Sequence, residues 1–334
     1  MNPFIASLHS NIVEDIRLLE IFVTAPLGLH SDIKMLRESL GLEGTDDLQQ
    51  PESRARRTSF RSITKDAPSL ALGTIRHLIQ ALHSLQALDT EAIAPVTTEW
   101  ITRARMVLDR SEEKIGNDLR SATASMITGL YVIIGPDSTN GRPVVEVVEA
   151  VLKGGAKILQ LRDKSTDKGD MLTTAAKMKA LCEEHDALFI VNDDADITVL
   201  SAAHGMHIGQ EDLPLIEARS VLETPQIVGC SSNTVEEAIQ AQADGADYIA
   251  IGAVFATNTM GKTARKAVGV DTVRRVKESV SPPVVAIGGI TVSNVPDVVR
   301  AGADCIAVVS SATMAVDPEA ATKALLDAIE AARH

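Results

Sequence analysis

The chain of 334 residues contains very few aromatic side chains and only three cysteines. Phe, Tyr and Trp together make up 2% of the sequence, so a buried core has to be built from Ala, Val, Ile and Leu. That composition suits close-packed helices and buried parallel strands. Cys182, Cys230 and Cys305 lack the spacing of a metal site, and each lies in an apolar or helical pattern. We expect buried thiols in a reducing compartment.

The chain also lacks an excess of positive charge and any long apolar run. It carries 32 basic and 45 acidic side chains, for a net charge of -13, which excludes a general nucleic-acid or membrane-surface role. Any anionic ligand must therefore be held by a local cationic cluster. The first residues show no basic segment followed by an apolar one, and no apolar run approaches bilayer length. We expect a cytoplasmic protein with neither nucleic acid nor membrane as a partner.

The length favours two domains, and the first half has the spacing of helices. From about residue 12 to residue 122 apolar residues recur every three or four positions, with breaks at 24–28, 41–53 and 89–96. This pattern predicts an all-α bundle of four or five helices over residues 1–125. We expect this bundle to serve in oligomerisation, which would make the protein a homo-oligomer, or in packing. The basic residues within 54–65 have three possible interpretations: a phosphate-binding site, a surface that binds a partner protein, or a solvent-exposed face.

The second half changes to short β-branched runs separated by amphipathic helical segments. Eight such β-α units fit a closed (β/α)8 TIM barrel over residues 129–334. The alternative, an open doubly wound sheet, is weakened because no GxGxxG turn follows the first run. The predicted strands are 130–135, 157–163, 188–193, 205–210, 226–231, 248–255, 284–290 and 305–312.

Polar side chains end several of these strands, at the rim where such barrels carry their active sites. Gln160, Arg162 and Lys164 alternate onto one side of the second strand, and two cations with an amide suit a diphosphate. A surface salt-bridge patch is the alternative. Asp193 and Asp212 follow the third and fourth strands and suit Mg²⁺ shared with phosphate oxygens. Helix capping is the competing interpretation for Asp212.

Small residues end the later strands. Ser231 ends the fifth, Gly288 and Gly289 the seventh, and Ser310 follows the eighth. Glycines and a serine ahead of helix starts are typical of the phosphate cradle of these barrels. Close helix packing is another explanation for the glycines. His207, on the fourth strand, is either a pocket residue or a hydrogen-bonded core histidine.

Seven motifs at these strand ends together resemble those of thiamine phosphate synthases. They are QLRDK, VNDD, GMHIGQED, GCS, IGAVFATNT, AIGGIT and VVSSA, and the resemblance covers about residues 129–332. It implies a transferase of thiamine biosynthesis, which joins 4-amino-2-methyl-5-hydroxymethylpyrimidine diphosphate to a thiazole phosphate or its carboxylate. The products are thiamine phosphate and diphosphate. The implied reaction is dissociative, through a pyrimidine cation stabilised by Mg²⁺ and basic residues.

The resemblance also implies roles for individual residues. Arg162, Lys164, Ser231 and Lys262 are expected to act on the diphosphate. Asp193 and Asp212 are expected to hold the metal, and the metal together with Asn192 is expected to position the diphosphate. The pyrimidine pocket is expected to contain Gln160, His207 and Gly209. Thr257 and Thr259 are expected to face the thiazole, and the thiazole phosphate is expected to bind at Gly289, Val309 and Ser310.

One loop departs from the family pattern. Members usually show a lysine directly after the second loop threonine, whereas Met260 follows Thr259 here and the next lysine is Lys262. The spacing indicates one inserted residue, a shift that the flexible lysine stem tolerates. We expect Lys262 to reach the diphosphate, with Arg265 or Lys266 as stand-ins.

Three other interpretations stay open at this point. One is a thiazole tautomerase-like paralogue, which resembles this barrel without the complete diphosphate and metal set. Another is a non-catalytic sensor of thiamine intermediates. Some members of the family also carry an N-terminal pyrimidine-phosphate kinase domain, but residues 1–125 contain no Gly-rich phosphate loop that would support this activity.

Overall fold

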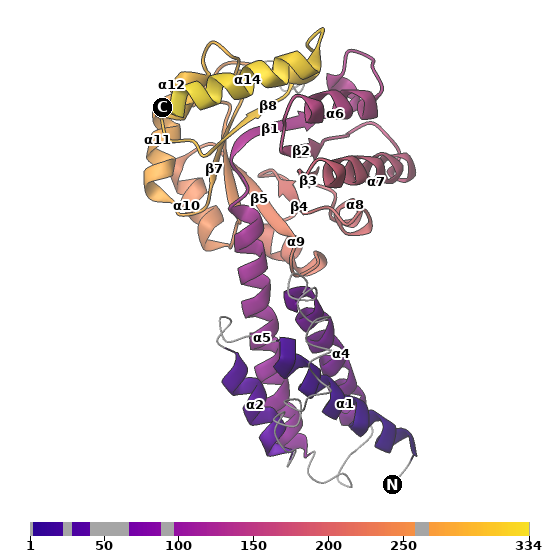
Figure 1. The fold of residues 1–334 in the computed structure, drawn as a ribbon. Coiled ribbons are helices and arrows are strands. Elements are labelled where there is room, and N and C mark those ends of the chain that lie inside the picture. The colour runs from indigo at the N-terminus through magenta and orange to yellow at the C-terminus, as the bar shows by residue number, and fades with distance from the viewer. Residues whose placement is uncertain (1–2, 23–28, 41–66, 88–96, 258–266, 334) are drawn as a thin grey trace, which may run out of the picture. The chain divides into compact units, whose positions relative to one another are not determined.

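The structure of the protein, a computed structural model, describes residues 3–22, 29–40, 67–87, 97–257 and 267–333. The chain divides into two units, Met1–Leu119 and Arg120–His334 (Figure 1). Each has a hydrophobic core of its own. No helix within the described ranges combines the length and the apolarity that crossing a membrane requires.

The first unit is helical, as the spacing of its apolar residues predicts. Its described helices are α1 (Pro3–Phe22), α2 (His30–Ser39), α4 (Ala67–Ala87) and the first part of α5 (Thr98–Ala124). Ile12, Ile16 and Leu19 lie on the buried face of α1, and Ile75 and Leu78 on that of α4. Their spacing of three or four residues is what places them on one face of each helix.

The core of this unit also contains charge. Arg37 on α2 donates from Nε to Glu20 Oε2 on α1 at 2.7 Å, and both side chains are only 4% exposed. Nearby on the same helix, Ser39 Oγ accepts the indole N–H of Trp100 at 2.8 Å. Removing one member of a buried ion pair leaves an uncompensated charge, so the two partners stabilise the fold only together.

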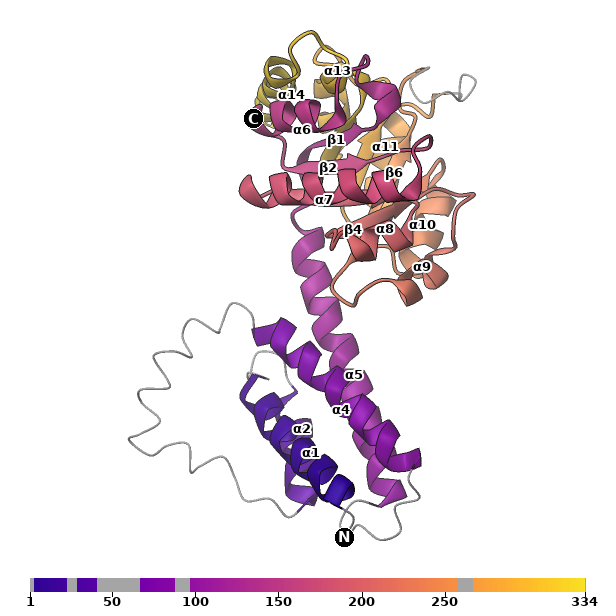
Figure 2. The ribbon, with the colours of Figure 1, turned by 90° about the vertical axis from the view of Figure 1, so that its right-hand side faces the viewer.

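The second unit, seen from its side in Figure 2, is a closed barrel of eight parallel strands in chain order. The first strand, β1, pairs with both β2 and β8 (Figure 1). The predicted fold class is confirmed. The strands are β1 (Gly129–Ile134), β2 (Ile158–Leu161), β3 (Leu188–Asn192), β4 (Gly205–Ile208), β5 (Ile227–Ser232), β6 (Tyr248–Gly252), β7 (Val284–Ile287) and β8 (Cys305–Val308). The eighth predicted run is shorter than expected, because a helix begins at Ser310.

Helices follow the strands and cover the outside of the barrel. They are α6 (Val144–Lys153), α7 (Lys168–Glu184), α8 (Ala195–Leu200), α9 (Leu215–Val221), α10 (Val235–Ala243), α11 (Val270–Ser279), α12 (Val295–Arg300), α13 (Ser310–Thr313) and α14 (Pro318–Arg333). A short 3-10 turn, η3 (Pro136–Ser138), follows β1. A large apolar core lies between strands and helices, and a smaller cluster fills the barrel interior, including Tyr131 and Tyr248. The parallel strands carry all eight carboxyl ends to the same rim.

The buried ion pair generates a stability prediction. Arg37→Met leaves Glu20 buried without its partner, and we expect the first unit to lose about 3 kcal/mol of unfolding free energy. Urea unfolding followed by fluorescence reports this unit selectively, because Trp100 is the chain's single tryptophan and is buried there.

The matched control replaces both partners. Combining Glu20→Leu with Arg37→Met removes the charge that would be left alone, so we expect most of the loss to be recovered. A double variant as unstable as the single one would contradict this account.

Candidate active site

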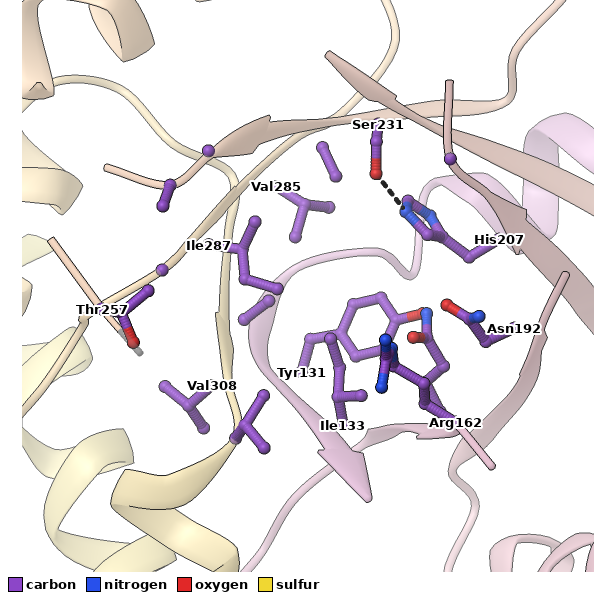
Figure 3. Close-up of a pocket in the computed structure, with 18 of the residues that line it drawn as sticks. Tyr131, Ile133, Arg162, Asn192, His207, Ser231, Thr257, Val285, Ile287 and Val308 are labelled. Carbon is purple, nitrogen blue, oxygen red and sulfur yellow. Dashed lines mark hydrogen bonds between the residues drawn. The ribbon is translucent and has the colours of Figure 1, made fainter. Parts of the chain in front are cut away.

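A cavity of about 840 Å³ opens at the carboxyl ends of the strands, and Figure 3 shows side chains from several strands converging on it. Thirteen of the fifteen site residues predicted from the sequence line it: Gln160, Arg162, Lys164, Asn192, Asp193, His207, Gly209, Asp212, Ser231, Thr257, Gly289, Val309 and Ser310. The other two, Thr259 and Lys262, lie outside the described residues. One concave site therefore brings together groups spread over 151 positions of the chain, from 160 to 310.

The cationic side of the cavity follows β2. The Arg162 backbone N–H donates to the Ile134 carbonyl at 2.8 Å, which continues the β1–β2 ladder past the strand end. The Arg162 guanidinium lies 3.6 Å from the Asp137 carboxylate, and Lys164 pairs with Asp193. Arg162 is only 18% exposed and both cations line the cavity, which argues against a mere surface salt-bridge patch. An acidic protein thus places two cations, each paired with a carboxylate, at this rim.

Two carboxylates meet opposite these cations. Asp193 has a left-handed backbone (φ 61°), and its N–H donates to the His207 carbonyl at 2.9 Å. Its carboxyl group hydrogen-bonds with that of Asp212. Burial, followed by the neighbouring Asp212, raises the pKa of Asp193 to about 6, while Lys164 opposes the shift. Two neighbouring carboxyl groups repel each other when both are ionised, and a cation between them relieves that repulsion.

Asp212 does not cap the following helix. α9 begins at Leu215 with Pro214 before it, and Asp212 Oδ2 instead accepts the Gly209 backbone N–H at 2.8 Å. Burial tends to raise its pKa, but the hydrogen bonds with Asp193 and Gly209 outweigh burial and lower it. The contact fixes the carboxylate at the cavity, so the capping alternative for this residue is wrong.

The carboxylate pair fits a hard divalent cation that takes its remaining ligands elsewhere. Within the described ranges no group of three or more His, Cys, Asp or Glu side chains is arranged to hold a metal. A cation bound by these two carboxylates would need oxygen atoms from substrate or water. Mg²⁺ typically binds in this way, with one or two carboxylates and phosphate oxygens.

The opposite side of the cavity has little charge. Gly288 and Gly289 at the end of β7 have φ of 104° and 65°. A Cβ on Gly288 would lie 2.4 Å from Ala253 Cβ, and one on Gly289 would lie 2.9 Å from Phe255 Cβ. These glycines are thus required by backbone conformation and by close approach to the segment after β6. Beside them α13 begins at Ser310, so backbone N–H groups face the same rim.

Between the two polar ends lies an apolar strip. Figure 3 shows Ile133, Val285, Ile287 and Val308 in this part of the cavity, with Thr257 at its edge. A flat heteroaromatic ring fits such a surface, because it needs apolar contact on its faces and polar groups only at its edges.

Two tyrosines were missed by the analysis of the sequence. Tyr131 and Tyr248 line the floor of the cavity, and their hydroxyl groups lie 3.1 Å apart. Gln160 Nε2 donates to Tyr131 Oη at 2.7 Å, and His207 Nδ1 lies 3.2 Å from Tyr248 Oη. The signal was their rarity: the chain has only two tyrosines, and both lie in apolar strands.

His207 is both a pocket residue and a hydrogen-bonded buried histidine. Its Nε2 lies 2.9 Å from Ser231 Oγ, the contact drawn in Figure 3. Burial lowers the pKa of His207 to about 4, against a weaker opposite effect of Asp212. The imidazole is therefore neutral at physiological pH.

Comparison with known proteins places this barrel in one family. A family model described as "Thiamine monophosphate synthase" matches residues 130–312. The thiamine-phosphate synthase of Shouchella clausii is 44% identical over 203 residues, covering 61% of this chain and 97% of its own. The solved thiamine phosphate pyrophosphorylase of Pyrococcus furiosus has 35% identity and a TM-score of 0.58, with coverage of 65% of this chain and 100% of its own.

One relative also resembles the helical unit. The thiamine-phosphate synthase of Thermosynechococcus vestitus is 35% identical over 310 residues, which cover 89% of this chain and 85% of that protein. Since the barrel unit starts at Arg120, an alignment of this extent includes part of the first unit. The helical region therefore occurs together with the barrel in another protein of this name.

The buried neutral histidine predicts a pH-dependent contribution to stability. The folded pKa of His207, about 4, lies below its ordinary value of 6.5, so its contribution is complete above pH 6.5 and is lost as the pH falls toward 4. Between pH 6 and 4.5 the wild-type protein should lose about 2 kcal/mol of unfolding free energy relative to His207→Gln.

The comparison with His207→Gln is needed because titration of Asp193 changes the unfolding free energy in the opposite direction. Its raised pKa stabilises the folded state at low pH, and that contribution is lost as the pH rises through about 6. Parallel pH profiles of the wild-type and His207→Gln unfolding free energies would disprove the assignment of a depressed pKa to His207.

Proposed function

The chain belongs to the thiamine monophosphate synthase family, a family of transferases, and we propose that its cavity joins a pyrimidine diphosphate to a thiazole phosphate. The substrates are 4-amino-2-methyl-5-hydroxymethylpyrimidine diphosphate and 4-methyl-5-(2-phosphoethyl)thiazole or its carboxylate. The products are thiamine phosphate and diphosphate, together with carbon dioxide when the thiazole carries the carboxylate. The observation that carries this proposal is the convergence of thirteen site residues on one cavity with a cationic end, an apolar strip and a phosphate cradle.

The leaving diphosphate belongs at the cationic end. Arg162 and Lys164 supply positive charge there, and the Ser231 hydroxyl supplies a neutral hydrogen bond from the neighbouring side. In the structure both cations are paired with carboxylates, Asp137 and Asp193. Exchange of these partners for diphosphate oxygens brings the cations to the substrate without burying unpaired charge.

Asp193 and Asp212 are the residues that would hold Mg²⁺. Bound there, Mg²⁺ would supply neutralisation of the charge that develops on the diphosphate as it leaves. The protein's own contribution is to keep Asp212 fixed on the Gly209 N–H and to hold Asn192 Nδ2 on Asp193 Oδ2 at 2.5 Å. These contacts orient both carboxylates before any ligand arrives.

The proposed reaction needs no protein nucleophile. The C–O bond between the pyrimidine methylene and the diphosphate breaks, and its electron pair leaves with the diphosphate. The thiazole nitrogen then donates its lone pair to the methylene carbon to form the C–N bond. Charge stabilisation and close positioning of two substrates are therefore the protein's main tasks.

The thiazole phosphate belongs at the uncharged end. Gly289, Val309 and Ser310 line the cavity there, and the Ser311 hydroxyl donates to the Ile290 carbonyl at 2.9 Å, which ties α13 to the end of β7. Thr257, across the apolar strip, faces the thiazole in this arrangement. The two rings then meet over the apolar residues, between two sites for anionic groups.

The other candidates lack support from the cavity. A tautomerase-like paralogue needs no complete diphosphate and metal set, yet Arg162, Lys164, Asp193 and Asp212 all line this cavity. A sensor of thiamine intermediates would bind its ligands in the same cavity, so turnover is what distinguishes a synthase from it. Oligomerisation or packing stays our proposal for the helical unit, with a second pyrimidine-phosphate kinase activity as the alternative.

The first test measures thiamine phosphate formation by the full chain with Mg²⁺. We expect turnover in the unmodified protein, and a fall in kcat/KM of at least about 100-fold in Asp193→Asn, since the metal loses a charged ligand. Asp196→Asn is the matched control: this carboxylate pairs with Lys168 outside the cavity, and its loss should change kcat/KM by less than about twofold.

The outcomes separate the candidates. A folded protein that binds both substrates without turnover would remove the synthase proposal and favour the sensor. Turnover that is insensitive to Asp193→Asn would remove the proposed metal site alone.

The shifted loop lysine needs a separate test. Lys262→Ala should lower kcat/KM about tenfold if its ammonium contacts the diphosphate, because a hydrogen bond to a charged group is lost. Lys266→Ala serves as the comparison. A larger loss in Lys266→Ala would transfer the role to that residue and show that the insertion displaces Lys262 too far.

A further inference from the structure

Five side chains form one continuous hydrogen-bonded chain across the floor of the cavity. From Gln160 Nε2 the contacts run to Tyr131 Oη (2.7 Å), then to Tyr248 Oη (3.1 Å). They continue to His207 Nδ1 (3.2 Å) and, from Nε2 of the same ring, to Ser231 Oγ (2.9 Å; Figure 3). All five side chains line the cavity, and Gln160 and the two tyrosines are almost completely buried.

Each interior member of this chain has a single hydrogen to donate. Burial raises the pKa of both tyrosines well above the ordinary value, so both hydroxyl groups keep their proton. Among the described residues the ring nitrogens of His207 face hydroxyl groups, those of Tyr248 and Ser231, and no carboxylate that would hold a second proton, so the buried ring carries one N–H. A buried hydroxyl or imidazole that cannot donate its hydrogen leaves a polar group unsatisfied, so the direction of one bond constrains the others.

The Gln160 amide sets that direction. Its Nε2 only donates, so Tyr131 Oη accepts from it. Among the residues that the structure describes, the remaining partner of Tyr131 Oη is Tyr248 Oη, which must then accept the Tyr131 hydrogen. Tyr248 in turn donates to His207 Nδ1, and the imidazole proton lies on Nε2, directed at Ser231.

We infer that Tyr248 is a positioning residue that holds His207 as the Nε2–H tautomer and thereby fixes what both ends of the chain offer to substrate. The inference rests on the proposed function. At one end the Ser231 hydroxyl accepts from His207 and keeps its own hydrogen for a diphosphate oxygen. At the other end Gln160 keeps its carbonyl oxygen for a donor, which matches the 4-amino group of the pyrimidine.

The reversed chain is the informative alternative. With the Gln160 amide turned over, every bond would run the other way, His207 would carry its proton on Nδ1, and Ser231 would donate to Nε2. Ser231 would then present only oxygen lone pairs to an anionic leaving group, which repels them. Holding a diphosphate therefore requires the direction we assign.

Tyr248 is held in place by its neighbours. A Cβ added to Gly229 on the adjacent strand β5 would lie 2.0 Å from Tyr248 Cζ, so the glycine leaves the space that the phenol ring fills. The His207 ring stacks on it with centroids 5.7 Å apart and an interplanar angle of 24°. The hydroxyl thus has little freedom to turn away from His207.

The direct test is the tautomer of His207 in the unmodified full chain. Histidine labelled with ¹⁵N distinguishes a protonated ring nitrogen from an unprotonated one, and His207→Gln identifies the signals among the eight histidines. We expect a protonated Nε2 and an unprotonated Nδ1 at pH 7. The opposite pattern, or a charged ring, would overturn the inference.

Two isosteric variants then separate positioning from general damage. Tyr248→Phe removes the donor to Nδ1, so the fixed tautomer should be lost and kcat should fall about tenfold, since Ser231 no longer reliably donates. Tyr131→Phe leaves that donor in place, so the tautomer should persist while KM for the pyrimidine diphosphate rises about tenfold through a freed Gln160 amide. An unchanged tautomer in Tyr248→Phe would overturn the inference.

The spectroscopic readout also separates this inference from the proposed function. A fixed Nε2–H tautomer that depends on Tyr248, in a protein that forms no thiamine phosphate, would remove the proposed reaction and leave the hydrogen-bonded chain standing. Turnover together with the Nδ1–H tautomer of His207 would support the proposed reaction and overturn the inference about Tyr248.

Discussion

The closure of eight parallel strands into a ring is the constraint on which the rest of the second unit depends. Because β1 pairs with both β2 and β8, no strand edge is left open and all carboxyl ends meet at one rim. Residues as distant in sequence as Arg162 and Ser310 thereby line the same cavity. The chain can place a cation, a carboxylate or a glycine at the site simply by ending a strand with it.

The electrostatics of that rim reconcile an acidic protein with the anionic substrates that we propose for it. The net charge of -13 opposes the approach of a diphosphate, so attraction has to come from a few cations at short range. Lys164 and Arg162 are each paired with a carboxylate, Asp193 and Asp137. Asp193 contacts Lys164 and lies beside Asp212. The proposed roles of the cation, the metal and the diphosphate therefore all involve this carboxylate.

The sequence was most informative where polar residues stand at positions that packing alone would fill with apolar ones. Gln160, Arg162 and Lys164 were predictable for this reason, as was the barrel itself from eight apolar runs. The conformations behind the motifs were less predictable. Asp212 was ambiguous between capping and metal binding until its contact with the Gly209 N–H was known. Gly288 and Gly289 are explained by positive φ and by the nearness of Ala253 and Phe255, which no local pattern reveals.

The tyrosines mark a different limit. A buried strand in a barrel is apolar on both faces, so period-two alternation does not reveal which side chains point to the interior. Tyr131 and Tyr248 therefore look like ordinary core residues in sequence. Inside the ring their side chains are almost completely buried, so each hydroxyl group needs a hydrogen-bond partner within the protein. Those partners, Gln160 and His207, reach up to the cavity, and this is why a requirement of the core extends into the chemistry of the site.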